Sequence, residues 1–203
     1  MVIMHEYSID VNHNRIIFYL AVISIGLSAI ITKLLNSLIT SIPFFELTVS
    51  FTAISVFGLL YTLFNNFFWK FKWLRKLGIV KTPDLNGIWE GYFKSSFHDW
   101  EKSYPATLDI KQNWSEICIS GKFNDSSSNS YLSSIKVRNG GGIKLFYSYQ
   151  NDKRPEKANA PFSDHKGYSS LELNNEETIL QGQYFNNPSN NKNHGILYLK
   201  RKP

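Results

Sequence analysis

Two long apolar stretches in the first third of the sequence constrain the fold more than any other feature. Residues 16–39 contain a single charged residue, Lys33, and residues 47–69 contain none. Each stretch exceeds the roughly 20 residues that an α-helix needs to cross a bilayer. Lys33 lies near the end of the first stretch, where a lysine side chain extends to the lipid headgroups. Residues 40–46 leave room only for a tight turn, so we predict a hairpin of two membrane-spanning helices.

A block of basic residues follows the second apolar stretch. The remaining part of the chain, residues 83–203, carries 15 basic and 13 acidic residues, so little of the net charge of +6 lies there. A basic block beside a membrane helix indicates contact with lipid headgroups and argues against a DNA or RNA polymer as partner. By the positive-inside rule, the block places the C-terminal part in the cytoplasm. Its members are Lys70, Lys72, Arg75, Lys76 and Lys81.

These patterns divide the chain into four regions. Residues 1–15 are expected to form a short cytoplasmic N-terminus, residues 16–69 the transmembrane hairpin, residues 70–82 a basic connector and residues 83–203 a cytoplasmic soluble domain. No small-residue cleavage site follows the first apolar stretch, so we expect a retained anchor rather than a cleaved signal peptide. The prediction is a two-pass protein of a bacterial inner membrane.

Small and hydroxyl residues recur four positions apart in the predicted helices. They are Ser24, Ser28 and Thr32 in the first helix, and Thr48 with Thr52 and Gly58 with Thr62 in the second. Such spacing lets helix backbones approach closely, and it would give copies of the protein a face for assembly in the membrane. These residues are also common in any spanning helix, so the alternative that they have no role in assembly stays open.

The soluble part alternates short segments of strand character with stretches rich in Gly, Asn, Ser, Asp and Pro. One buried face per segment and short connections imply that consecutive strands pair in antiparallel fashion. We therefore predict an all-β soluble domain, an eight-stranded antiparallel up-and-down β-barrel. The expected strands are residues 87–97, 103–112, 114–123, 129–138, 143–150, 165–173, 178–186 and 194–201.

Tyrosines continue several of the inward faces of these strands. An eight-stranded barrel encloses space for its own side chains or for one small ligand, and a tyrosine offers a flat ring with a hydrogen-bonding tip. The alternative is that these tyrosines are ordinary strand residues whose hydroxyls reach solvent at the rim. The candidates are Tyr131, expected with Ser133 on the face of Ile135, Tyr147 and Tyr149, which follow Leu145, and Tyr184, on the face of Leu180.

No arrangement of reactive residues points to an enzyme. The five histidines are scattered without metal-ligand spacing, and the glycines at 140–142 lack the lysine and hydroxyl residue of a phosphate-binding loop. Cys118 is the only cysteine, which excludes an intramolecular disulfide and a zinc–thiolate site built within one chain. We therefore expect no catalytic residues, no metal and no cofactor, and a domain that binds rather than catalyses.

The segment LNGIWEGYF, residues 85–93, opens the predicted barrel with a Gly-x-Trp pattern at Gly87 and Trp89. Together with the paired spans and the basic block, it makes the chain similar to the two-transmembrane, β-strand-rich effectors of bacterial cyclic-oligonucleotide antiphage signalling (CBASS). The resemblance covers essentially the whole chain. It implies that the barrel binds a cyclic dinucleotide made by a partner nucleotidyltransferase, and that the protein then forms a homo-oligomer that disrupts the inner membrane and ends the infection.

A cyclic dinucleotide fits these residues in physical terms. Its bases would stack on the tyrosines, and its phosphates would take hydrogen bonds from Arg138 and Arg154. Because the ligand is large for the bore of eight strands, we expect it to bind at an open end of the barrel.

Two other functions stay open on the sequence. The Gly-x-Trp pattern is also typical of lipocalins, and a membrane-tethered lipocalin-like binder of a small ligand would have a wide, apolar bore. A non-enzymatic membrane assembly factor would instead use its barrel to contact another protein.

Overall fold

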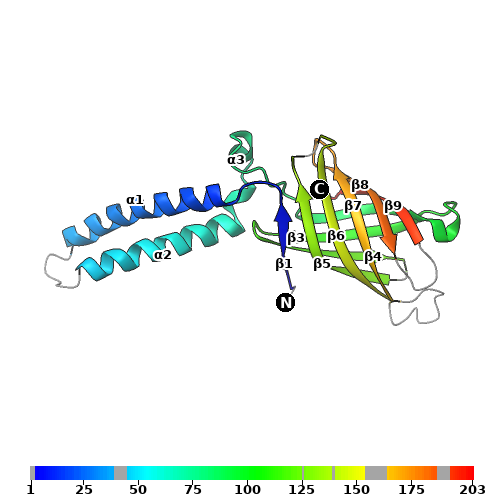
Figure 1. The fold of residues 1–203 in the computed structure, drawn as a ribbon, viewed down its shortest axis with the longest axis horizontal. Helices are drawn as coiled ribbons and strands as arrows, with labels where there is room; N and C mark the ends of the chain where they lie inside the picture. The colour runs from blue at the N-terminus through cyan, green and yellow to red at the C-terminus, as the bar shows by residue number, and fades with distance from the viewer. Residues whose placement is uncertain (1–2, 39–44, 125, 139, 154–163, 187–192) are drawn as a thin grey trace. The chain divides into compact units, whose positions relative to one another are not determined.

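The computed structural model describes residues 3–38, 45–124, 126–138, 140–153, 164–186 and 193–203 (Figure 1). The chain divides into two compact units, one made of Met1–Val11 with Thr82–Pro203 and the other of Asn12–Lys81. The first unit is mostly β-sheet and the second is helical. A β-sheet domain preceded by an apolar helix is therefore confirmed.

The helical unit contains two long helices at the predicted positions. α1 (Asn14–Leu38) and α2 (Phe45–Asn66) are followed by a 3₁₀ turn, η1 (Phe68–Lys70), and a short helix, α3 (Lys72–Lys76). Within the described residues, α1 is the one helix that is long and apolar enough to cross a membrane, over Asn14–Leu34. Most of the predicted turn at 40–46 lies outside the described residues.

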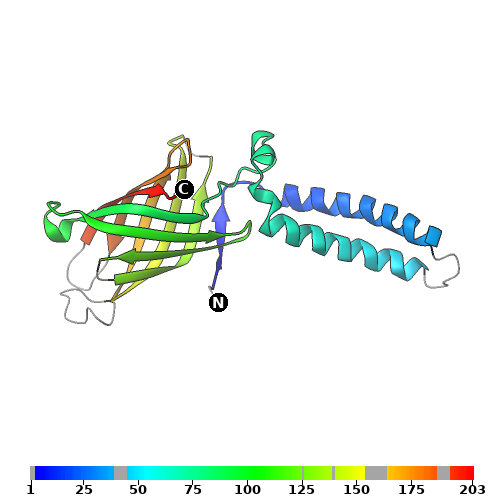
Figure 2. The same cartoon turned by 180° about the vertical axis from the view of Figure 1, so that it is seen from behind.

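All eight predicted strands are present. They are β2 (Gly87–Ser95), β3 (Tyr104–Gln112), β4 (Glu116–Phe123), β5 (Ser126–Lys136), β6 (Ile143–Lys153), β7 (His165–Leu173), β8 (Ile179–Asn186) and β9 (Asn193–Arg201). Each strand pairs in antiparallel fashion with the next, and β9 pairs back with β2, so the sheet closes on itself (Figures 1 and 2). Closure leaves β2 and β9 without free edges.

A ninth strand comes from the N-terminus, which was expected to be only a short cytoplasmic segment. β1 (His5–Ile9) lies between β4 and β5, antiparallel to β4 and parallel to β5. His5 lies opposite Ile117, and Tyr7 lies opposite Ser133. The N-terminus is thus part of the β-sheet unit, although residues 10–115 separate it from β4 and a still longer stretch separates it from β5.

The two ends of the barrel differ in chemistry. The end at which β2 begins is filled by Leu85 and Trp89, which are fully buried, and the Trp89 indole donates a hydrogen bond to the Leu85 carbonyl (2.9 Å). The Arg201 guanidinium lies over the Trp89 ring, 4.7 Å from its centroid. We call this the leucine end. The opposite end, where β2 and β6 finish, carries buried tyrosines and is called the tyrosine end.

Between the two ends lies an aliphatic core. Residues from alternate positions of the strands fill it, as expected when one face of every strand points inward. Burying each such side chain contributes about 1.5–3 kcal/mol. The most buried members include Leu108, Ile110, Ile119, Ile135, Leu145, Leu171, Leu180 and Leu199.

Candidate functional site

Three tyrosines meet inside the barrel at the tyrosine end. Tyr147 and Tyr149 come from β6 and Tyr184 from β8, and these three residues are called the tyrosine cluster. They are only 3%, 7% and 9% exposed, and the Tyr147 and Tyr149 rings lie 5.8 Å apart. The Tyr149 hydroxyl donates a hydrogen bond to the side-chain oxygen of Asn186 (2.8 Å). Three of the predicted ligand-binding residues are therefore brought together, all facing inward.

Glycines make room for the rings of this cluster. A Cβ atom added at Gly167, on β7, would lie 2.3 Å from the Tyr149 ring, and one added at Gly195, on β9, would lie 2.4 Å from the Tyr184 ring. Real Cβ atoms do not approach other atoms so closely, so each ring occupies space that only a glycine leaves free. The tyrosine positions thus depend on residues of the neighbouring strands.

The cluster continues into a wider aromatic layer. The Phe93 ring of β2 makes an edge contact with Tyr184 (6.2 Å between centroids) and another with Phe123 (5.5 Å), and it stacks on Tyr104 (5.5 Å). Aromatic pairs of this kind contribute beyond the area that they bury. The tyrosine end therefore contains a layer of packed aromatic rings.

The phenol groups of the cluster stay protonated at neutral pH. Burial raises the pKa of Tyr147 to about 12, although its hydrogen bond with Ser169 opposes the shift. Burial also raises the pKa of Tyr149, with a smaller contribution from the other two phenols, and burial raises the pKa of Tyr184. Neutral phenols are hydrogen-bond donors as well as acceptors, which suits a ligand rich in carbonyl, ring-nitrogen and phosphate acceptors.

Tyr131 does not join the cluster, contrary to the face expected for it. A β-bulge on β5 shifts the register between Ser130 and Leu132. The strand has one extra residue there, so Ser128 and Ser133 both face inward while Tyr131 is 50% exposed. The ring of Tyr131 instead lies 5.9 Å from the Lys166 ammonium on the outer wall.

The two predicted phosphate-binding arginines are not both near the cluster. Arg138 follows the end of β5 at the leucine end, where its backbone N–H binds the Asp10 carboxylate (3.0 Å). Arg154 lies outside the described residues. Arg138 thus follows the leucine end of β5, whereas Tyr149 lies toward the opposite end of β6.

Polar residues that the sequence analysis missed continue the inward face of β6. Asn151 is 4% exposed, and Lys153 shares its face because alternate residues of a strand point the same way. β6 extends to Lys153, whereas the predicted strand stopped at residue 150. The sequence contained a signal for these two residues, because the alternation of Tyr147 and Tyr149 continues to Asn151 and Lys153.

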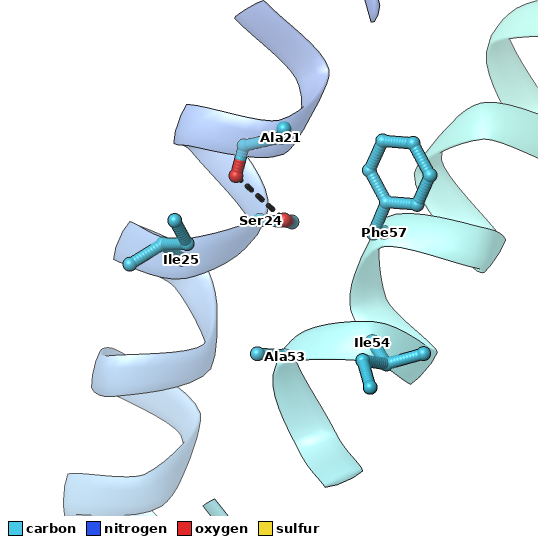
Figure 3. Close-up of a pocket in the computed structure, with 6 residues that line it drawn as sticks. All are labelled: Ala21, Ser24, Ile25, Ala53, Ile54 and Phe57. Carbon is cyan, nitrogen blue, oxygen red and sulfur yellow. Dashed lines mark hydrogen bonds between the residues drawn. The ribbon is translucent and has the colours of Figure 1, made fainter. Parts of the chain in front are cut away.

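The predicted assembly residues lie within one helical hairpin. Ser24 and Ser28 are 3% and 4% exposed, and their hydroxyls donate to the carbonyls of Ala21 and Ile25 on the same helix. Thr32 is half-buried. Figure 3 shows Ser24 facing α2. The cleft between the two helices has a volume of about 280 Å³ and is lined by Ala21, Ser24, Ile25, Ala53, Ile54 and Phe57. The serines thus pack α1 on α2 in a single chain, and a role between chains stays a prediction.

Among the residues that the structure describes, no group of three or more His, Cys, Asp or Glu side chains is placed to hold a metal ion.

Comparisons with known families agree with this arrangement. Residues 80–201 match the family model described as the Cap15 cyclic dinucleotide receptor domain, and residues 14–70 match the one described as Cap15 TM helices. No curated protein matches the chain. The resemblance to CBASS effectors is confirmed, because the two matches cover the membrane region and the β-sheet domain in turn. The chain belongs to the Cap15 family, in which a transmembrane region is joined to a cyclic dinucleotide receptor domain.

Proposed function

We propose that this protein is an antiphage effector whose barrel binds a cyclic dinucleotide at the tyrosine end. Binding then drives association of the transmembrane hairpins, disruption of the bacterial inner membrane and abortive infection. The observation that carries the proposal is the inward-facing tyrosine cluster within the residues that match the receptor-domain model. The protein acts by binding, without catalytic residues, metal or cofactor, and its ligand comes from a partner nucleotidyltransferase.

The tyrosine cluster forms the floor of the proposed ligand site. Because its rings are 9% exposed or less, the ligand lies on the rim side of the cluster rather than deep in the barrel. There the bases stack on aromatic rings, and the Lys153 ammonium, with Arg154 beside it in sequence, compensates the phosphate charge. The leucine end is unsuited to this ligand because Leu85 and Trp89 fill it.

The orientation in the membrane follows from the residues after α2. Exposed aromatic side chains alternate there with basic ones, as in Phe71, Trp73 and the neighbouring Lys72. Aromatic rings and cationic side chains are both favoured at the headgroup level of a bilayer, and basic residues stay on the cytoplasmic side. We therefore place both termini and the barrel in the cytoplasm, with two passes through the inner membrane.

Isothermal titration of the full-length protein in detergent against a panel of cyclic dinucleotides tests the proposal. We expect one member to bind, and Tyr149→Phe to weaken binding by about 1 kcal/mol through loss of one hydrogen-bonding hydroxyl. Tyr184→Ala should cost about 1–3 kcal/mol, the range for loss of a base-stacking ring.

Tyr92→Phe is the matched control, because Tyr92 lies on the outer wall of β2 and stacks on Tyr198. Its affinity should equal that of the wild-type protein. No binding to any cyclic dinucleotide would contradict the proposal, and equal losses in Tyr92→Phe and Tyr149→Phe would move the site away from the tyrosine end.

A further inference from the structure

The wall of the barrel contains a slot that only β1 fills. β4 and β5 pair directly at the tyrosine end, where residues 120–122 lie opposite residues 127–129. Toward the leucine end the two strands diverge and β1 lies between them, with Tyr7 to Ile9 opposite Ser133 to Ile135 (Figures 1 and 2). The β-bulge of β5 marks the point where the slot opens. There the Ser130 hydroxyl bonds both the Ile119 N–H (3.0 Å) and the His5 ring (2.8 Å).

Specific hydrogen bonds hold β1 in this slot. The Tyr7 side chain is 9% exposed, and its hydroxyl donates to the Trp114 carbonyl (2.9 Å). Just after β1, the Asp10 carboxylate accepts hydrogen bonds from the N–H groups of Val137 (2.8 Å) and Arg138 (3.0 Å). These bonds fix the strand along its length, and residues 10–13 then join it to α1.

A buried glutamine connects β1 to the segment of chain that follows the helical unit in sequence. Gln112 is 3% exposed, and its amide nitrogen donates to the Tyr7 hydroxyl (3.3 Å) and to the Pro83 carbonyl (3.2 Å). Its amide oxygen accepts from the Leu85 N–H (2.8 Å). An amide side chain has two donors and one acceptor group, and all are used here. Tyr7 precedes the helical hairpin in sequence and Pro83 follows it, so the Gln112 side chain binds the chain both before and after the hairpin.

Two members of the tyrosine cluster, Tyr147 and Tyr184, lie on the same rung of the barrel wall as Tyr7. Opposite positions in neighbouring strands run from Tyr7 to Ser133, to Tyr147, to Ser169 and to Tyr184. Side chains opposite one another in this way are in direct contact range. The Ser133 hydroxyl, between Tyr7 and Tyr147, is buried and has no hydrogen-bond partner among the described residues. A displacement of the Tyr147 ring therefore has a short physical path to β1.

We infer that β1 is the link through which the ligand-bound barrel acts on α1, and that Gln112 ties this link to the connection after the hairpin. The inference rests on the proposed function and adds the route by which binding reaches the membrane. Ligand-driven association of chains requires β1 to be docked in the slot between β4 and β5. When β1 leaves the slot, ligand binding no longer drives association of the chains, although the ligand site remains.

The test uses the full-length protein in lipid nanodiscs, with two readouts: affinity for the cyclic dinucleotide that binds the wild-type protein, and ligand-dependent chemical crosslinking of chains. Tyr7→Ala and Gln112→Leu should keep ligand affinity within about twofold. They should need at least about tenfold more ligand to reach half-maximal crosslinking, within the range typical of coupling between sites. Tyr92→Ala, on the outer wall, is the matched control and should change neither readout.

A disulfide bond that holds β1 in the slot provides the opposite test to the variants that release it. Ser8 and Ser134 lie opposite each other on the outward side of β1 and β5, so Ser8→Cys with Ser134→Cys, in a Cys118→Ser background, should form a disulfide within one chain. The oxidised protein should still associate when ligand is added. Association of Tyr7→Ala and Gln112→Leu at the wild-type ligand concentration would overturn the inference.

Loss of association in the locked protein would overturn it as well, because release of β1 would then be the signal. If the wild-type protein binds no cyclic dinucleotide, the proposed function fails and the coupling role fails with it. If Tyr7→Ala and Gln112→Leu both bind the ligand and associate like the wild-type protein, the coupling role of β1 fails and the proposed function stands. The two failures are therefore distinguishable.

Discussion

At the scale of single residues, the tyrosine cluster depends on glycines in the neighbouring strands. Gly167→Ala would place a methyl group where the Tyr149 ring lies, so the ring has to move. We expect a destabilisation of about 1–3 kcal/mol, typical of overpacking a core, together with weaker ligand binding. Thermal unfolding followed by the β-sheet signal in circular dichroism measures the first effect, and calorimetry measures the second.

Gly140→Ala is the control for that substitution. A Cβ at Gly140 meets no atom of the described residues within 4 Å, so this variant should unfold like the wild-type protein. Equal stability of the Gly167→Ala protein would mean that the Tyr149 ring has room to shift and does not define the floor of the site.

Asp10 makes the docking of β1 dependent on pH. Burial opposes ionisation, but hydrogen bonds from the Val137 and Arg138 N–H groups and the charge of Lys136 leave the pKa of Asp10 below its usual value of 3.8. A lowered pKa in the folded state means that the carboxylate stabilises β1 above about pH 4, and that this contribution is lost as pH falls through the lowered pKa.

Hydrogen exchange at the Val137 and Arg138 amides measures this effect, after correction for the intrinsic exchange rate at each pH. Protection should fall below pH 4 in the wild-type protein, and it should be low at every pH in Asp10→Ala. Ser8→Ala, which removes an outward hydroxyl of β1, should leave protection unchanged. Protection that is the same in Asp10→Ala and wild type would show that the carboxylate does not hold the strand.

The orientation of the tyrosines shows why the site could be predicted only in part from the sequence. Tyr147, Tyr149 and Tyr184 follow the alternation of regular strands, and the alternation alone predicts that they face inward. Tyr131 follows the same rule in the sequence, but one extra residue in β5 reverses it. A bulge depends on how a strand matches its neighbours, so the sequence of β5 by itself does not reveal it.

At the scale of elements, the stripe of small residues on α1 packs that helix on α2. Ser24→Leu and Ser28→Leu would put large side chains into a buried position, and we expect them to separate the helices. The double variant should bind ligand like the wild-type protein, because the barrel is a separate unit, and it should lose ligand-induced crosslinking and phage protection.

Ile23→Leu with Ile30→Leu is the matched control, since both side chains are exposed on α1 and keep their apolar character. Crosslinking and protection should be normal in that protein. Normal assembly of the Ser24→Leu, Ser28→Leu protein would instead place the contacts between chains elsewhere, for example along Thr48 and Thr52 or between barrels.

At the scale of the whole molecule, the barrel should fold without the hairpin but with an open slot. A fragment of residues 82–203 keeps β2 to β9 and, of the strands that the structure describes, lacks β1. We expect a β-rich circular dichroism spectrum. A peptide of residues 1–12 added in trans should raise its unfolding temperature, because it restores the pairs of Tyr7 to Ile9 with β5.

The same peptide with Tyr7→Ala is the control, and it should raise the unfolding temperature less, because the bond to the Trp114 carbonyl is lost. A helical or disordered spectrum of the fragment would show that the eight strands are not sufficient to fold. An unfolding temperature unchanged by either peptide would show that β1 docks only when it is part of the chain.

The sequence by itself determined the division into an apolar helical part and a β-sheet part, the number of strands in the meander and their bounds to within a few residues. These features follow from local patterns: unbroken apolar stretches, alternation with period two, and turn residues between strands. The family resemblance could be stated at the same stage, because its Gly-x-Trp segment and basic block are local as well.

Only the tertiary structure decided how β1 and the two ends of the barrel are arranged. β1 is five residues long and lies far in sequence from β4 and β5, so no local pattern identifies its partners. Arg138 and Tyr149 are close along the chain, yet β5 ends and β6 begins at the leucine end, so Tyr149 lies farther along β6, toward the tyrosine end. Contacts between distant segments depend on strand order and register, and these emerge only when the whole sheet closes.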